Sequence, residues 1–133
     1  MKKLFFCCLI LFLCSKNKLF AQQQKLPLPI FLQLIDSTKK IDINHATAFK
    51  HVELPKKFFN AFIGYIKDSS ATLLPNVTSE VYYTFTSNNG KIINGDVYWN
   101  EQNGYIVFKV DGHVFVNAFS KEGVAQLKSI FKL

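Results

Sequence analysis

The fold is decided by residues 79–119, which read SEVYYTFTSNNGKIINGDVYWNEQNGYIVFKVDGHVFVNAF. Apolar and polar side chains alternate along this stretch, and the alternation is broken at points rich in Asn and Gly, which predicts four strands. The strands are expected at 80–86, 91–99, 105–110 and 113–119. Because the connections between them are short, we expect an antiparallel β-meander, with helices on either side of it in the sequence packed against it.

The Asp111–Gly112 dipeptide is the strongest register signal, because it is typical of a two-residue type I′ hairpin turn. That turn predicts the cross-strand pairs Val110–His113, Lys109–Val114, Phe108–Phe115, Val107–Val116 and Ile106–Asn117. Both faces of this hairpin then carry apolar side chains. We therefore expect the second face of the sheet to be partly covered by a helix, a subunit or a ligand. Within the second strand, Asn94–Gly95 indicates a bulge or a further turn.

Apolar residues at helical spacing predict three helices outside the meander. One begins at Pro29 and continues through Ile35, with Gln33 and residues 36–40 on its polar side. Another runs from Pro55 to about Asp68. The last is capped by Ser120 and buries Val124, Leu127, Ile130 and Phe131.

Residues 41–54 carry conflicting signals. The triplet Ile41–Asp42–Ile43 alternates like a short strand, whereas Asn44 is able to cap a helical turn. We favour a helix here.

The predicted element order defines an α+β protein with one domain over residues 30–133, after a flexible lead-in at 22–29. A helix set against an antiparallel meander is similar to the layout of cystatin-like folds. This is an analogy of layout alone, because no sequence motif accompanies it.

Residues 1–21 have the pattern of a secretory signal peptide, with a cationic start and an apolar run from Leu4 to Cys14. The run is too short to cross a bilayer as a helix. We expect cleavage after Ala21, with Ser15 as the alternative site, and a secreted or periplasmic protein. A lipid anchor on Cys14, or retention of the whole segment, would instead give a membrane-anchored form.

Removal of residues 1–21 changes the charge and the cysteine content. The remaining chain has twelve lysines and nine carboxylates, a net charge of +3, and no cysteine. The whole chain contains no arginine, the side chain that forks onto phosphates and guanine edges. Nucleic acid is therefore excluded as the expected partner, and a disulfide-stapled fold is not expected. The exclusive use of lysine over arginine, together with many Asn, Ile and Phe residues, suggests an AT-rich bacterial genome.

The polar residues match no catalytic or metal motif. His45 and His51 are six residues apart and do not form a helical zinc pair, and Glu53 does not complete one. We expect both histidines to be partly exposed on a helix or loop. The carboxylates of Asp96 and Glu101, with that of Asp111, lie near predicted strand ends and are expected to be solvated. We predict no catalytic residue, no metal and no cofactor.

The meander is unusually rich in aromatic residues. Most of them are expected in the core, but tyrosines also serve at binding surfaces because they combine a large area with a hydroxyl group. The candidate binding residues are Tyr82, Tyr98, Tyr105 and His113. The sequence therefore favours a non-enzymatic envelope protein that binds another envelope or secreted protein, a peptide or an apolar ligand through the sheet. The alternatives are a small envelope hydrolase whose site assembles only in three dimensions, and a membrane-tethered accessory protein.

Overall fold

The computed structural model of the chain describes residues 23–74 and 77–133. The expected signal peptide, its cleavage sites and Cys14 lie outside these ranges. Within the described ranges, no helix combines the length and apolarity that a membrane crossing requires.

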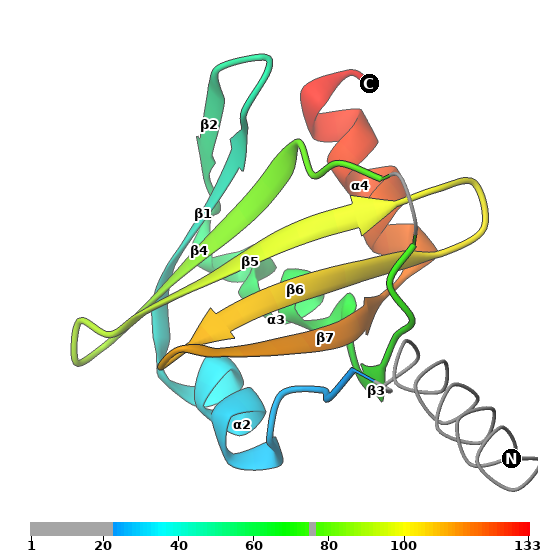
Figure 1. Ribbon diagram of the computed structural model, residues 1–133. Coiled ribbons are helices and arrows are strands. Elements are labelled where there is room, and N and C mark those ends of the chain that lie inside the picture. Colours follow the sequence, from blue (N-terminus) through cyan, green and yellow to red (C-terminus); the bar gives the residue numbers. More distant parts are fainter. Residues whose placement is uncertain (1–22, 75–76) are drawn as a thin grey trace, which may run out of the picture.

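A seven-stranded antiparallel sheet, with the strand order β2-β1-β4-β5-β6-β7-β3, forms the body of the molecule (Figure 1). The strands are β1 Thr38–His45, β2 Lys50–Glu53, β3 Ile66–Ser70, β4 Val81–Ser87, β5 Ile92–Trp99, β6 Gly104–Val110 and β7 His113–Phe119. The helices are α2 Leu28–Ser37, α3 Phe59–Gly64 and α4 Lys121–Phe131, with a 3₁₀ turn at Lys56–Phe58. The α+β class is therefore confirmed, and the expectation of four strands is an undercount.

The predicted meander corresponds to β4 through β7. Its last hairpin has the expected register, from Val110 opposite His113 to Ile106 opposite Asn117. Asp111 and Gly112 both have positive φ values, 50° and 78°, as a type I′ turn requires. The two turn residues Asp111 and Gly112 therefore determine the register along the whole of β6 and β7.

The substitution Gly112→Val is expected to destabilise this hairpin. A β-branched residue at a φ of +78° lowers the free energy of unfolding by about 1–2 kcal/mol, because its Cβ crowds its own backbone. The expected readout is a lower thermal midpoint for Gly112→Val and a nearly unchanged one for Gly112→Asn, since asparagine tolerates the left-handed region. Equal midpoints for the two variants would contradict the turn assignment.

Gly95 is neither a bulge nor a turn, and that expectation was wrong. Strand β5 runs through it without a break, with Tyr83 opposite it on β4 and Phe108 on β6. A Cβ at this position would lie 2.6 Å from Cδ1 of Ile106, which is inside the van der Waals limit. Glycine is present because the core side chains of β6 fill the space above it.

The prediction of helix for residues 41–54 was also wrong, because this segment forms the β1–β2 hairpin. Strand β1 pairs along most of its length with β4, and Ile41 and Ile43 are fully buried beneath the helices. The strand-like alternation was the correct signal, and the pairing partner that stabilises it lies about forty residues away in the sequence.

The helix expected over residues 55–68 is shorter than predicted. A 3₁₀ turn leads into α3, which ends at Gly64, and Ile66 opens β3. Ile66 is buried opposite Phe119 of β7. Since Ile63 and Ile66 are both buried, their three-residue spacing satisfied the helical pattern although the helix ends at Gly64 and β3 begins at Ile66.

The first helix ends earlier than expected, at Ser37, so that residues 38–40 open β1 instead of lying on its polar side. The last helix matches expectation except that Ile130 is only partly buried. In α2, Phe31 and Leu34 are buried, and α4 buries Val124, Leu127 and Phe131. Ser120 Oγ accepts a hydrogen bond from the backbone N–H of Gly123 at 3.1 Å, which makes it the N-cap of α4. Helices α2, α3 and α4 pack on the same face of the sheet and contribute to one hydrophobic core (Figure 1).

The segment before α2 is tied to the sheet. Leu26 is fully buried, the carbonyl of Gln24 accepts a hydrogen bond from the backbone N–H of Val116, and Lys25 pairs with Asp68 at 2.7 Å. Residues 24–26 therefore complete the β7 edge beside β3.

Candidate functional site

The face of the sheet opposite the helices is the candidate site, and we call it the open face. It is formed by every second residue of each strand, and the register aligns these residues into rows across β2, β1, β4, β5, β6 and β7. One row consists of Glu53, Asp42, Thr84, Asn94, Lys109 and Val114. The next consists of His51, Asn44, Tyr82, Asp96, Val107 and Val116.

Three of the four predicted binding residues, Tyr82, Tyr98 and Tyr105, lie on this face. Tyr98 lies opposite Tyr105 and stacks on it, with ring centroids 5.0 Å apart and an interplanar angle of 12°. Tyr82 lies opposite Asp96, one strand away. The register thus places Tyr82 on the strand next to the stacked pair of Tyr98 and Tyr105, and we call these three residues the tyrosine cluster.

The three tyrosines differ in their access to solvent. Tyr82 is 38% exposed, Tyr98 is half-buried and Tyr105 is only 3% exposed. Burial, together with the nearby charge of Asp96, raises the pKa of Tyr98, so its hydroxyl stays a neutral donor at physiological pH. Tyr82 therefore offers the main accessible aromatic surface of the cluster, and the buried Tyr105 ring packs against the ring of Tyr98.

Part of the open face is covered by the chain itself. The backbone N–H of Leu74 lies 3.4 Å from the hydroxyl of Tyr105, which places the segment after β3 over that end of β6. In Figure 1 this green segment rises from β3 past the ends of β7 and β6. Val116, on the same face of β7, is also fully buried. The covered part of the open face is therefore the Tyr105 end of β6 and Val116 beside it, whereas Lys109 and Val114, farther along β6 and β7, are exposed.

His113 does not belong to the tyrosine cluster. It is exposed at the β6–β7 turn and lies on the helix-covered side of the sheet, where its ring centroid is 6.3 Å from that of Phe115. The sequence signal that suggested it was its position at a strand end, and this position does not bring it near the other candidates.

A polar network extends the open face onto the β1–β2 hairpin. The imidazole of His51 lies between two oxygens, with Nδ1 2.8 Å from Asn44 Oδ1 and Nε2 3.2 Å from Asp42 Oδ1. Lys40 Nζ lies 3.0 Å from the same oxygen of Asp42 and 3.4 Å from Glu53. The hydrogen bond with Asp42 raises the pKa of Lys40. The carboxylate of Asp42 thus faces both the imidazole of His51 and the ammonium group of Lys40.

The second histidine of the hairpin differs from the expected exposed residue. His45 is 3% exposed and its ring packs on Phe131 of α4 at 5.1 Å. Its Nδ1 accepts the backbone N–H of Ala48 at 3.0 Å, with the Thr47 hydroxyl at 3.2 Å, and Nε2 lies 3.6 Å from Glu80. This sequence of carboxylate, imidazole and hydroxyl is reminiscent of a nucleophile triad.

The hydrogen bond from Ala48 argues against catalysis by His45. The single lone pair of Nδ1 is already engaged by the Ala48 N–H, so little basicity remains to activate the Thr47 hydroxyl. His51 shows no better geometry, since both of its ring nitrogens face oxygens of Asn44 and Asp42. Among the described residues, no cluster of three His, Cys, Asp or Glu side chains is arranged to hold a metal.

The expected carboxylates do not converge. Asp96 lies in the middle of β5, Glu101 lies in the β5–β6 connection and Asp111 occupies the β6–β7 turn. Glu101 and Asp111 are exposed, and Asp111 lies 3.5 Å from Lys91. Only Asp96 lies in the candidate site.

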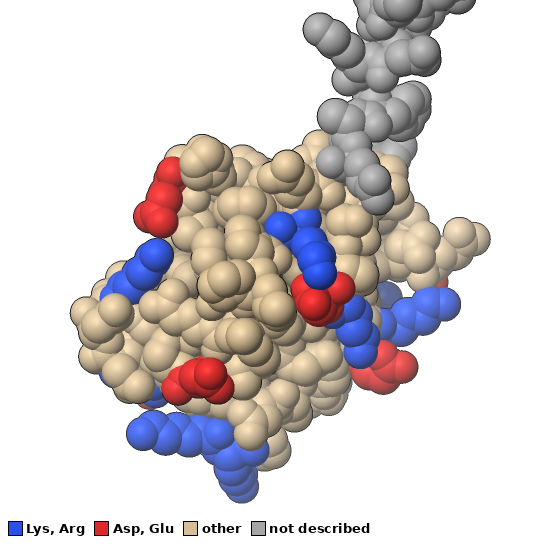
Figure 2. Space-filling view, turned by 90° about the horizontal axis from the view of Figure 1, so that it is seen from below, with Lys and Arg blue, Asp and Glu red and all other residues tan. Residues whose placement is uncertain are grey.

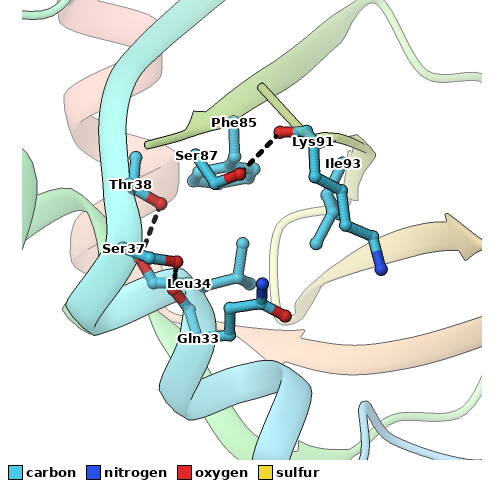
Figure 3. Close-up of a pocket in the computed structure, with 8 residues that line it drawn as sticks. All are labelled: Gln33, Leu34, Ser37, Thr38, Phe85, Ser87, Lys91 and Ile93. Atoms are coloured by element: carbon cyan, nitrogen blue, oxygen red, sulfur yellow. Dashed lines mark hydrogen bonds between the residues drawn. The ribbon is translucent and has the colours of Figure 1, made fainter. Parts of the chain in front are cut away.

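A small cavity lies between α2 and the β4–β5 hairpin, but it is too small to hold a ligand (Figure 3). Its volume is about 10 Å³, close to that of one water molecule. The hydroxyls of Ser37, Thr38 and Ser87 are turned to backbone carbonyls at 2.6, 2.6 and 3.1 Å, so they are not free to bind a guest.

Comparison of the chain with protein-family models, with curated proteins and with solved structures finds no match. The argument for function therefore rests on the geometry of the open face.

Proposed function

We propose that this chain is a non-enzymatic binding module that holds another protein, a peptide or an apolar ligand on the open face of its sheet. We further propose that it is exported to the bacterial envelope, which the signal-peptide pattern of residues 1–21 supports. The observation that carries the binding proposal is the tyrosine cluster with Asp96 beside it, in which Tyr82 is exposed on a rigid central strand.

The chemistry of the Tyr82 side chain and the strands that flank it both favour this surface for recognition. Tyrosine offers a large flat area and a hydroxyl with few rotatable bonds to immobilise, which is why it is frequent among residues that dominate binding energy. Strand β4 lies between β1 and β5, so Tyr82 is held by paired strands on both sides. Thr84 and Asn94, which bond to each other at 3.1 Å, provide polar groups next to it.

The substitution Tyr82→Ala is expected to weaken partner binding at least about tenfold while leaving the thermal midpoint nearly unchanged. The partner is first captured from the organism's own envelope extract and identified, and its affinity is then measured by calorimetry. Phe58→Ala is the matched control, since Phe58 is a similarly exposed aromatic residue, 44% accessible, outside the sheet.

Two results would contradict the proposal. Wild-type protein that retains no partner would remove the binding function, and equal affinities for Tyr82→Ala and wild type would remove the open face as its location. A large loss of stability in Tyr82→Ala would show that the ring serves packing.

A further inference from the structure

Helix α2 is apolar on two sides. Its inner side buries Phe31 and Leu34 in the core, and its outer side carries Leu28, Leu32 and Ile35, which are 53%, 46% and 41% exposed. The outer residues follow the i, i+4, i+7 spacing of a single stripe along the helix. A helix with apolar residues on both sides is normally covered on both, whereas the residues that the structure describes cover only the inner side of α2.

A groove lies directly beside this outer stripe. It has a volume of about 260 Å³ between α2, α3 and β3, and its lining is mainly apolar. The apolar lining residues are Phe31, Ile35, Ile63 and Ile66. Since Ile35 belongs both to the stripe and to the groove wall, a ridge and a hollow of similar chemistry adjoin each other on one surface.

We propose that two copies of this chain associate through this surface, with the outer stripe of α2 in each copy seated in the groove of the other. When a ridge and a groove adjoin on one surface, a two-fold axis places the ridge of each copy in the groove of the other. Such an interface closes the assembly at two copies. The contact is a helix-in-groove contact, in which residues at i, i+4 and i+7 serve as anchors.

The charges beside the stripe and the groove are complementary. The only charged residue of α2 is Asp36, exposed next to Ile35, and the groove rim carries the exposed Lys67. Neither forms an ion pair within the described part of the chain, whereas the neighbouring Asp68 is already paired with Lys25. The inserted stripe thus brings a carboxylate to a groove that presents a lysine.

The same charges argue against a lipid surface as the occupant. Anionic membranes select apolar patches that are ringed by an excess of lysine. Figure 2, which views the molecule from the end where α2 lies in Figure 1, shows a largely uncharged surface on which lysines and carboxylates stand side by side. An apolar centre with a mixed-charge rim is the anatomy of a protein–protein contact.

Sedimentation equilibrium of the purified full chain over a range of concentrations tests the proposal. Wild type is expected at twice the chain mass, and Leu32→Glu is expected to raise the dissociation constant at least about tenfold with an unchanged thermal midpoint. Ile92→Glu is the control, because Ile92 is 58% exposed at the start of β5, on the face of the sheet opposite the helices. The Ile92→Glu variant is expected to remain dimeric.

Wild type that stays monomeric at the highest concentration would overturn the proposal. So would a dimer that persists in Leu32→Glu, since association would then use another surface, such as the apolar segment at residues 4–14. If Leu32→Glu proves poorly folded, Leu28→Ser removes apolar area from the same stripe at the end of the helix and is expected to weaken the dimer; its failure to do so would equally count against the contact.

Discussion

Replacing Asn117 by leucine is expected to lower the free energy of unfolding by roughly 2–5 kcal/mol. Asn117 is fully buried in β7, where its Oδ1 accepts the backbone N–H of Leu26 at 2.8 Å and its Nδ2 donates to the carbonyl of Lys67 at 2.9 Å. Leucine fits the volume but leaves both backbone groups without a partner in the interior. Urea unfolding, followed by circular dichroism, measures the loss.

Asn94→Leu is the matched control, because Asn94 is an exposed asparagine of β5 in the same sheet. Its replacement is expected to change stability by less than about 0.5 kcal/mol. Hydrogen exchange adds a local readout, since the amide of Leu26 should exchange faster in Asn117→Leu than in wild type. If Asn117→Leu proves as stable as wild type, Asn117 does not fasten the N-terminal segment and β3 to β7.

The meander could be predicted from sequence because its signals are local. Asp111–Gly112 specifies its turn through two adjacent residues, and the two-residue alternation of Val81, Tyr83 and Phe85 assigns them to one face without knowledge of a partner strand. The same alternation placed Tyr82 on the opposite face, where the structure has it.

The missed strands depend on partners distant in sequence. Ile41–Asp42–Ile43 is too short to exceed a competing helix signal until β4 lies beside it, and Ile66 continues a helical spacing until Phe119 of β7 lies opposite it. Long-range pairing therefore decided both segments.

The sequence could predict which residues form the candidate site, but it could not predict how exposed each of them is. Three tyrosines on neighbouring strands follow from the register. The burial of Tyr105 does not, because its hydroxyl lies against the backbone N–H of Leu74, thirty-one residues earlier. The structural role of Asn117 could not be predicted for a similar reason, since its hydrogen-bond partners Leu26 and Lys67 are 91 and 50 residues away. Its polar side chain at an inward position was the available signal.

Replacing Gly123 by alanine is expected to destabilise the protein by up to roughly 3 kcal/mol, although alanine is the better helix former by about 1 kcal/mol. Gly123 lies in the first turn of α4, where a Cβ would be 2.7 Å from Cε1 of Phe119 and 2.7 Å from Cβ of Tyr65. The Tyr65 Cβ is bonded to its own backbone and cannot swing away, so α4 must move off the sheet. The thermal midpoint should fall.

The matched control for this prediction is Gly64→Ala, at the end of α3, where a Cβ would meet no atom within 4 Å. There the helix preference acts alone, and stability is expected to stay the same or rise slightly. The two substitutions add the same methyl group to a helical glycine and differ only in the space around it. Opposite signs for the two changes would attribute the loss to the contact of α4 with Phe119 and Tyr65, whereas a rise in both would mean that α4 packs less closely on β7 than the structure has it.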